Sequence, residues 1–207
     1  MDRTAKRNRL VDSLVARESL SEPTEAAMRA VPRHLFVPDS LQSRAYEDTP
    51  LPIGEDQTIS APHMVAIMTE LLALKAGQRV LEIGTGCGYH AAVTAEIVGA
   101  SNVYTVEYHE TLARRAQETL SEAGYGDVNV RASDGRNGWP EHAPYDRSYL
   151  TCAGSEFPQP VVEQLAAGGV ILGPLGNGTQ RLIRAKKRRD GSLRRERHTH
   201  VRFVPLK

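Results

Sequence analysis

The stretch from residue 79 to residue 88, R-V-L-E-I-G-T-G-C-G, constrains the fold of this 207-residue chain more than any other. The apolar run before the first glycine predicts a buried strand. Glycine then recurs at Gly84, Gly86 and Gly88, where it lets the backbone turn sharply and lets a ligand approach it closely. A strand that leads through such a loop into a helix is how α/β sheets hold nucleotide-like ligands. Tyr89 replaces the third glycine of the dinucleotide fingerprint G-x-G-x-x-G, so the loop is poorly suited to a pyrophosphate.

The rest of the chain predicts an α/β fold. Apolar spacing predicts helices over residues 4–20, 21–31, 61–74, 89–98, 109–123 and 158–167, and strands over 79–83, 102–106, 127–132, 145–151 and 170–176. Asp190-Gly191 lies between two alternating segments, Q-R-L-I-R-A-K and H-V-R-F-V-P-L, and predicts a C-terminal hairpin of two strands. This order implies a mostly parallel sheet with helices on both faces and an antiparallel edge.

In such a sheet, ligand-binding residues lie at the C-terminal ends of the strands. Glu107 ends the second of the parallel strands, 23 residues after Gly84. We expect its carboxylate to accept hydrogen bonds from two ribose hydroxyls, in preference to acting as a helix cap or a surface acid. Asp134, which precedes Gly135 after the third parallel strand, either forms a plain turn or lies at the base of the ligand.

The stretch Q-T-I-S-A-P-H-M, residues 57–64, precedes an apolar pattern of helical spacing. Ser60 is therefore expected to be the N-cap of the helix, with Pro62 in its first turn. Free N–H groups at that helix start are suited to a carboxylate ligand. From spacing alone, Ser60 either caps the helix and does nothing more, or also touches such a ligand.

Composition is typical of a globular protein. No stretch approaches the roughly 20 apolar residues of a membrane span, and the charged N-terminus lacks the apolar region of a signal peptide. Cys87 and Cys152 are too few for a disulfide framework or a four-ligand zinc site, so we expect a cytoplasmic protein without a metal. They follow strands that we expect to be neighbours in the sheet. The two cysteines are either small packing residues or a redox-sensitive pair.

The net charge of +1 hides an asymmetry. Residues 1–180 hold 15 basic and 23 acidic side chains, a net charge of −8, whereas residues 181–207 hold 11 basic and 2 acidic, a net charge of +9. A basic segment of this kind either binds nucleic acid or an acidic partner, or is a solvated edge hairpin guarded by lysine and arginine. We favour the edge hairpin.

Four blocks together resemble a known family. They are R-H-L-F-V-P with A-Y-E-D-T-P-L-P-I-G, Q-T-I-S-A-P-H-M, V-L-E-I-G-T-G-C-G-Y, and Y-D at 145–146 with Q-L-A-A-G-G at 164–169. The chain thereby resembles the protein-L-isoaspartate O-methyltransferases, which are class I S-adenosylmethionine-dependent methyltransferases with a Rossmann-like doubly wound sheet. The likeness runs from about residue 33 to residue 176, with a weaker echo in F-V-P-L near the end.

The resemblance implies that a methyl group moves from S-adenosyl-L-methionine to the free carboxylate of an L-isoaspartyl residue, a reaction of protein repair. Ser60 carries over as the active-site serine. The implied cofactor and pocket residues are Thr58, Ile59, His63, Gly84, Thr85, Gly86, Gly88, Glu107, Asp134 and Gly135. His63 is alternatively an ordinary first-turn histidine. Glu82 either orients the glycine loop or reaches the cofactor's amino group.

The chemistry of the implied reaction suits this chain. A carboxylate with a pKa near ~4 is ionised at neutral pH, so no general base is required. Proximity, alignment and partial removal of water then remain as the enzyme's tasks. The chain departs from the family pattern on the side of the site that is expected to bind the methyl acceptor. The departures are Glu55-Asp56 before the Q-T-I-S block and Gly154-Ser155 after the fourth parallel strand.

We expect one domain over residues 1–207, with an N-terminal cap (1–57), a cofactor-binding core (58–176) and a basic hairpin (177–207). We expect a monomer that acts on isoaspartyl-containing peptides and proteins and binds neither membrane nor nucleic acid. Two alternatives remain open. One is a nucleic-acid methyltransferase, although the N-P-P-Y-type tetrapeptide of amino-methylating enzymes is missing. The other is a non-catalytic or divergent paralogue that binds S-adenosylmethionine.

Overall fold

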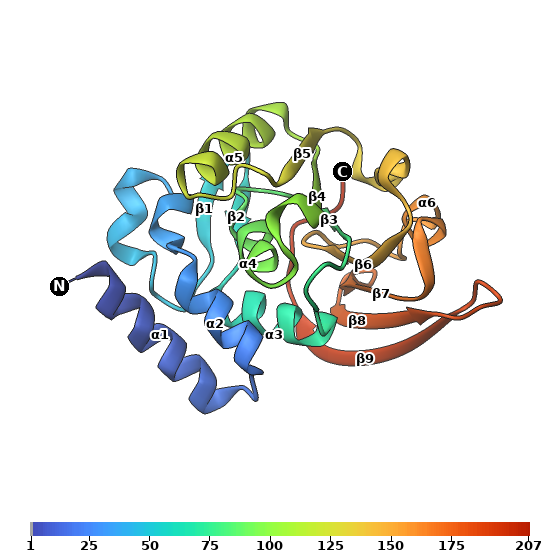
Figure 1. The fold of residues 1–207 in the computed structure, drawn as a ribbon, viewed down its shortest axis with the longest axis horizontal. Helices are drawn as coiled ribbons and strands as arrows, with labels where there is room; N and C mark the ends of the chain where they lie inside the picture. The colour runs from blue at the N-terminus through green and yellow to red at the C-terminus, as the bar shows by residue number, and fades with distance from the viewer. Residues whose placement is uncertain (1) are drawn as a thin grey trace.

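The computed structural model describes residues 2–207. One seven-stranded sheet has the order β5-β4-β3-β6-β7-β8-β9 (Figure 1). Its strands are β3 (Val80–Ile83), β4 (Val103–Glu107), β5 (Asn129–Ala132), β6 (Tyr145–Leu150), β7 (Leu165–Leu175), β8 (Gln180–Lys187) and β9 (Leu193–Val201). The first five in spatial order are parallel, and β8 and β9 run antiparallel to their neighbours. The predicted α/β fold, with a mostly parallel sheet and an antiparallel hairpin edge, is confirmed.

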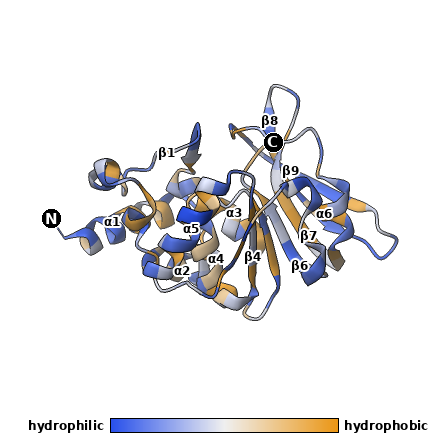
Figure 2. Ribbon diagram, turned by 90° about the horizontal axis from the view of Figure 1, so that it is seen from above, coloured by the Kyte–Doolittle hydropathy of each residue, from blue (hydrophilic) through white to orange (hydrophobic). Residues whose placement is uncertain are grey.

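Helices cover the two faces unequally. They are α1 (Arg3–Arg17), α2 (Glu22–Ala30), α3 (Pro62–Leu72), α4 (Tyr89–Val98), α5 (Glu110–Glu122) and α6 (Gln159–Glu163). Helices α1 to α5 share one apolar cluster with Val80, Tyr149 and Leu172. The opposite cluster holds Leu81 and Leu150 together with side chains of α6. This alternation along each strand is what a sheet buried on both faces requires, and Figure 2 shows apolar strands between helices with polar outer surfaces.

Three local features differ from the expected elements. A small hairpin, β1 (Leu51–Gly54) with β2 (Gln57–Ile59), was not predicted. Its turn places Glu55 and Asp56 at φ of 52° and 57°, which is the geometry that Asn-Gly usually signals. Helix α6 ends at Glu163, and β7 already begins at Leu165, where the helix was expected to continue to residue 167. Strand β9 ends at Val201, so the F-V-P-L segment does not continue the hairpin.

Tyr89 explains why a glycine is missing from the usual position of the dinucleotide fingerprint. Its ring is 3% exposed and packs edge-on against Phe36, with ring centroids 5.7 Å apart. The guanidinium of Arg33, which is fully buried, lies 4.8 Å from the same ring and donates to the carbonyl of Ala45 at 2.9 Å. Tyr89 therefore attaches the N-terminal segment to α4 by apolar and cation–π contacts.

The start of α3 corrects the expected N-cap. The helix begins at Pro62 with Ala61 as N-cap, and no side chain caps it from that position. Asp48 supplies the acceptor instead, because its Oδ1 accepts from the backbone N–H of His63 at 2.9 Å. Pro62 has no N–H and that of His63 is taken, so neither is available to a ligand carboxylate. The capping acceptor comes from a segment 15 residues earlier, which local spacing cannot reveal.

We predict that Asp48→Ala lowers the free energy of unfolding by about 1–2 kcal/mol, because it removes this cap. Asp48→Asn keeps an acceptor at the helix start and is the matched control. Ser60→Ala should change stability by less than about 0.5 kcal/mol. Denaturant unfolding of the three variants checks this, and a larger loss in Ser60→Ala than in Asp48→Ala would contradict it.

Candidate active site

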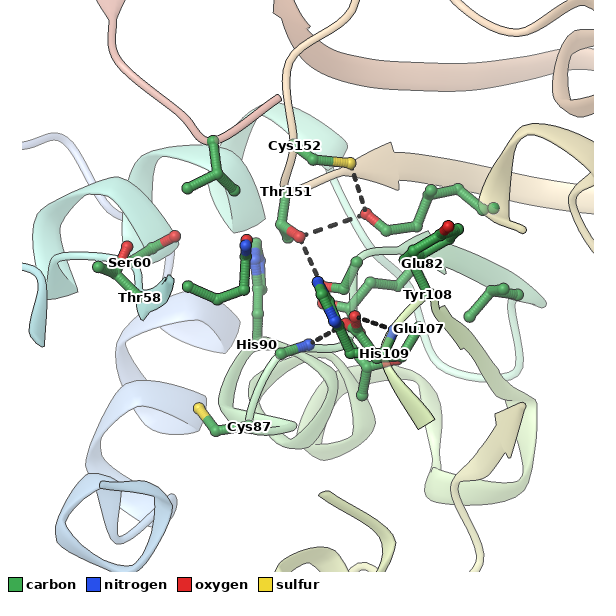
Figure 3. Close-up of a pocket in the computed structure, with 18 of the residues that line it drawn as sticks. Thr58, Ser60, Glu82, Cys87, His90, Glu107, Tyr108, His109, Thr151 and Cys152 are labelled. Atoms are coloured by element: carbon green, nitrogen blue, oxygen red, sulfur yellow. Dashed lines mark hydrogen bonds between the residues drawn. The ribbon is translucent and has the colours of Figure 1, made fainter. Parts of the chain in front are cut away.

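A cavity opens at the carboxyl ends of β3, β4 and β6 (Figure 3). Its empty volume, mouth included, is about 770 Å³, a usual size for a small-molecule site. The segments that line it lie far apart in the chain: residues 57–60, 82–87, 106–109, 151–152 and 204–207. Strand order reverses between β3 and β6, and the crevice at such a point is where open α/β sheets bind ligands.

The glycine loop adopts the backbone that its sequence predicts. Gly84, Gly86 and Gly88 have φ of +98°, +56° and +87°, values that favour glycine over other residues. A side chain at Gly84 would collide with the hydroxyl of Thr151, which donates to the carbonyl of Gly84 at 2.5 Å. The loop is therefore closed tightly against the end of β6, and its residues 84–86 line the cavity.

Glu107 fastens this loop to the end of β4. Its Oε2 accepts from the N–H of Gly86 at 2.8 Å, and its Oε1 accepts from the N–H of His109 at 3.0 Å. The side chain is 5% exposed and lines the cavity. A carboxylate has about four acceptor positions, so Glu107 retains capacity for two hydroxyls of a ligand. The predicted contact with ribose remains a prediction that this geometry permits.

The residues predicted to lie on the acceptor side line the opposite part of the cavity. Figure 3 shows Thr58 and Ser60 on the side opposite Glu107 and Thr151. Thr58, Ile59 and Ser60 all line the cavity. Ser60 does not cap α3, because Ala61 is the N-cap residue and Asp48 accepts from the N–H of His63, so the hydroxyl of Ser60 is not used at the helix start. It is therefore free to donate to a ligand.

Three predicted site residues are placed elsewhere. Within residues 2–207, His63, Gly88 and Asp134 do not line the cavity. The ring of His63 lies 2.9 Å from Asp48, so the structure favours the ordinary first-turn interpretation. Gly88 shapes the loop as the N-cap residue of α4. The carboxylate of Asp134 is engaged by Arg136 at 2.7 Å.

Two other predicted site residues, Thr85 and Gly135, do line the cavity. Thr85 lines it, and its hydroxyl lies 2.7 Å from that of Thr105. Gly135 also lines it, where a side chain would collide with Ile83. The Gly135 backbone can therefore approach the end of β3 only because it carries no side chain.

Two buried polar side chains form the floor of the cavity. Glu82 is completely buried, and burial raises its pKa to about 8, against a smaller lowering effect of the hydrogen bond from Thr105. His90 is 6% exposed, and burial lowers its pKa to about 3. Sequence reasoning did not single out His90. The available signal was a histidine within the otherwise apolar run Y-H-A-A-V.

The C-terminal segment closes one side of the cavity, which the sequence did not predict. The N–H of Ala153 donates to Val204 at 2.7 Å, and the N–H of Leu206 donates back to Ala153 at 2.8 Å. Lys207 Nζ then lies 3.2 Å from Nε2 of His109. In Figure 1 the red chain accordingly runs from β9 back to the middle of the molecule.

The two cysteines are free thiols that both line this cavity. Strands β3 and β6, which precede them, are neighbours as expected. Figure 3 nevertheless shows Cys87 and Cys152 at opposite ends of the cavity. The Sγ of Cys152 donates to the carbonyl of Ile83 at 3.7 Å, which is a packing role.

Comparison with known proteins identifies the family. The model of the protein-L-isoaspartate(D-aspartate) O-methyltransferase family matches residues 5–207. The chain belongs to this family. It is 52% identical to protein-L-isoaspartate O-methyltransferase 2 of Archaeoglobus fulgidus, over 100% of this chain and 95% of that one. It is 50% identical to the corresponding protein of Hyperthermus butylicus, over 97% of this chain and 88% of that one.

Solved structures agree on the architecture of the methyltransferase. A protein-L-isoaspartate O-methyltransferase superposes with a TM-score of 0.90 at 31% identity, covering 97% of this chain, which spans 66% of that longer structure. A putative member from Plasmodium falciparum, solved with S-adenosyl-L-homocysteine, has a TM-score of 0.84 at 24% identity, covering 97% and 98% of the two chains. At that identity it shows the shared fold.

Two features are absent from residues 2–207. None of the helices there combines the length and the apolar character that crossing a membrane requires. No group of three or more histidine, cysteine, aspartate or glutamate side chains there is arranged to hold a metal ion.

We predict that Glu82 makes the ligand-free methyltransferase less stable as pH rises. Its folded pKa of about 8 exceeds the ordinary value of 4.5, so the folded state keeps a proton that the unfolded chain releases. The contribution of Glu82 is thus fully present below about pH 4.5 and declines by up to about 1.4 kcal/mol per pH unit until about pH 8.

Glu82→Gln removes this decline, so the variant should gain stability relative to the wild type between about pH 5 and about pH 8. Denaturant unfolding at both pH values measures the gain. Glu118→Gln, on the exposed face of α5, is the control and should show none. An equal difference between Glu82→Gln and wild type at both pH values contradicts the burial argument.

Proposed function

We propose that this methyltransferase transfers a methyl group from S-adenosyl-L-methionine to the free carboxylate of L-isoaspartyl residues in damaged proteins. The observation that carries the proposal is the family match over residues 5–207, joined to one cavity with a nucleotide-type loop on one side and Ser60 on the other. S-adenosyl-L-methionine is the methyl donor of this family. The nucleic-acid and non-catalytic alternatives are not favoured by this membership.

The residues of the donor side fit the donor. The backbone of Gly84 and Gly86 is accessible to an adenosine-sized ligand. Glu107 keeps two acceptor positions for hydroxyls beside this backbone. The bound donor supplies an electrophilic methyl group on its sulfonium. The protein therefore has to hold and orient the two reactants, which alone can remove a large part of a bimolecular barrier.

The acceptor side needs a hydrogen-bond donor and no base. An isoaspartyl carboxylate is already ionised at neutral pH. The hydroxyl of Ser60 donates to this carboxylate and aligns one oxygen with the methyl group. Thr58, on the same side of the cavity, offers a second hydroxyl. Since the N–H groups at the start of α3 are blocked or absent at residues 62–63, the side chain of Ser60 carries this role.

The C-terminal segment limits access of water. Val204, Pro205 and Leu206 present apolar surface to the cavity, and two backbone hydrogen bonds hold them against Ala153. An acceptor carboxylate that loses part of its hydration there becomes a better nucleophile. The same apolar surface also lowers the dielectric around the developing bond, which strengthens each polar contact.

Two further expectations are part of this proposal. We infer a monomer, and we infer that the protein works in the reducing cytoplasm, where the two free thiols are stable. We also infer that damaged proteins are its substrates. We interpret the basic hairpin β8–β9 as a charged edge of the sheet.

A pair of peptides tests the function directly. The two have one sequence and differ only in carrying L-isoaspartyl or L-aspartyl at a single position. With methyl-labelled S-adenosylmethionine, we expect base-labile label in the isoaspartyl peptide to exceed that in the aspartyl peptide by on the order of 100-fold or more, because the site must distinguish the placement of one carboxylate. Equal labelling of the two, or none in either, would contradict the proposal.

A further inference from the structure

A second groove lies on one face of the C-terminal hairpin. Residues of β7, β8 and β9 and of the loop after β6 line it, and its volume, mouth included, is about 1020 Å³. Leu175 and Ile183 are each 7% exposed there, whereas Arg181, Arg195 and Arg197 are exposed. The groove therefore has an apolar floor and a cationic rim, and we call it the arginine groove.

Two of these arginines are neighbours on one face of β9. Arg195 and Arg197 are two residues apart, so their side chains leave the strand on the same side. In the register of β8 and β9, Arg195 is opposite Ala185 and Arg197 is opposite Ile183, and both partners are buried. The guanidinium groups thus stand beside apolar surface, which the long arginine stems can cover. Guarding the edge of the sheet does not require this gathering on one face.

The arginine groove carries a surplus of positive charge. Among the described residues that line it, only Glu156 is acidic, and it accepts from Arg195 at 2.5 Å. Two of the three guanidinium charges are therefore not balanced within the lining. The whole chain has the same polarity, since residues 1–180 carry a net charge of −8 and residues 181–207 carry +9. The body of the protein thus repels an acidic peptide, and the arginine groove attracts it.

One short segment separates the arginine groove from the cavity that holds Ser60. Cys152 lines the cavity and Ser155 lines the groove, so the Cα atoms of these two residues are at most about 11 Å apart. Between them, the carbonyl of Gly154 accepts from the N–H of Gly176 at 3.0 Å, which holds the segment against the end of β7. A peptide with its isoaspartyl residue in the cavity can therefore reach the groove within about three to six residues.

The arginine groove unites two sequence features that the proposed function leaves unused. One is the basic C-terminal segment, and the other is Gly154-Ser155, where the chain departs from the family pattern. A side chain at Gly154 would lie 3.0 Å from the carbonyl oxygen of Glu156, so glycine permits the tight turn that brings Ser155 and Glu156 to the groove. The departure on the acceptor side thus shapes a wall of the groove.

We propose that the arginine groove binds acidic side chains of the protein substrate at about three to six residues from the isoaspartyl residue, and so favours damaged sites in acidic segments. Arg181 and Arg197 contact the carboxylates, because Arg195 is already paired with Glu156. The inference rests on the proposed function and names the substrates that the site prefers. Since both contacts are made by one peptide, binding in the groove raises the effective concentration of the isoaspartyl residue at the cavity. KM falls as a result, and kcat stays the same.

Pairs of isoaspartyl peptides test this by fluorescence anisotropy. The two members of a pair differ only in carrying two glutamates or two glutamines at about four to five residues from the isoaspartyl residue, and one pair is made for each flank. The protein is saturated with S-adenosylhomocysteine, so no methyl group is transferred. At about 0.05 M salt, we expect the glutamate peptide of one flank to bind roughly threefold to tenfold more tightly than its glutamine partner. The difference should vanish at about 0.5 M salt.

Equal affinities within both pairs at low salt overturn the proposal, and this readout depends on no variant. An RNA oligonucleotide is measured alongside the peptides. Tight binding of the RNA together with equal affinities for the peptides would assign the arginine groove to nucleic acid instead.

Two double variants locate the contact. Arg181→Gln with Arg197→Gln should abolish the preference for glutamate and leave affinity for the glutamine peptide within about twofold. Arg188→Gln with Arg189→Gln removes the same charge from the tip of the hairpin, outside the described lining of the groove, and should keep most of the preference. All four side chains are exposed, so the fold tolerates their loss. Equal losses in the two double variants contradict the assignment.

Glu156→Gln gives a prediction of opposite sign. It removes the acidic side chain of the groove and frees Arg195, so the preference for the glutamate peptide should increase. A purely structural role of the pair between Glu156 and Arg195 predicts no such gain. An unchanged or smaller preference in Glu156→Gln contradicts the electrostatic account.

Methyl transfer to the same peptides separates this inference from the proposed function. Labelling of both isoaspartyl peptides with equal KM leaves the proposed function intact and overturns only the role of the arginine groove. Tighter binding of the glutamate peptide without labelling of either peptide does the reverse. A lower KM for the glutamate peptide at unchanged kcat supports both.

Discussion

The carboxylate of Glu107 is the contact on which the site depends. It accepts one backbone N–H from the glycine loop and one from the segment after β4, and so joins the ends of two neighbouring parallel strands. Gly84 closes the same loop against Thr151 at the end of β6. Three strand ends are thereby held in one fixed arrangement before any ligand binds, which is the preorganisation that a positioning enzyme needs.

The proposed donor and acceptor sides are built by different physical means. The donor side consists of backbone groups and buried carboxyls on strands of a close-packed sheet, where movement is costly. The acceptor side is the junction of β2 and α3 together with the C-terminal segment, held by Asp48 and by backbone bonds to Ala153. The departures from the family pattern, Glu55-Asp56 and Gly154-Ser155, lie in or beside these acceptor-side segments.

The sequence predicts what depends on local order and periodicity. The spacing of residues along the sequence predicts three features. They are the strand, glycine loop and helix around Gly84, the hairpin at Asp190-Gly191, and the position of Glu107 at a strand end. Ser60 was wrongly expected to cap α3, because the actual acceptor, Asp48, reaches the helix through tertiary folding. For the same reason His63 pairs with Asp48, and residues 204–207 return to the cavity without any local signal.

The central claim is that one cavity holds the methyl donor on the glycine loop and the acceptor carboxylate on Ser60. Its most direct test compares turnover and S-adenosylhomocysteine affinity in Ser60→Ala. Losing one hydrogen bond to a charged group should lower kcat with an isoaspartyl peptide by roughly tenfold or more, and leave the affinity within about twofold. The reverse pattern, weakened binding of S-adenosylhomocysteine with unchanged kcat, would contradict the account.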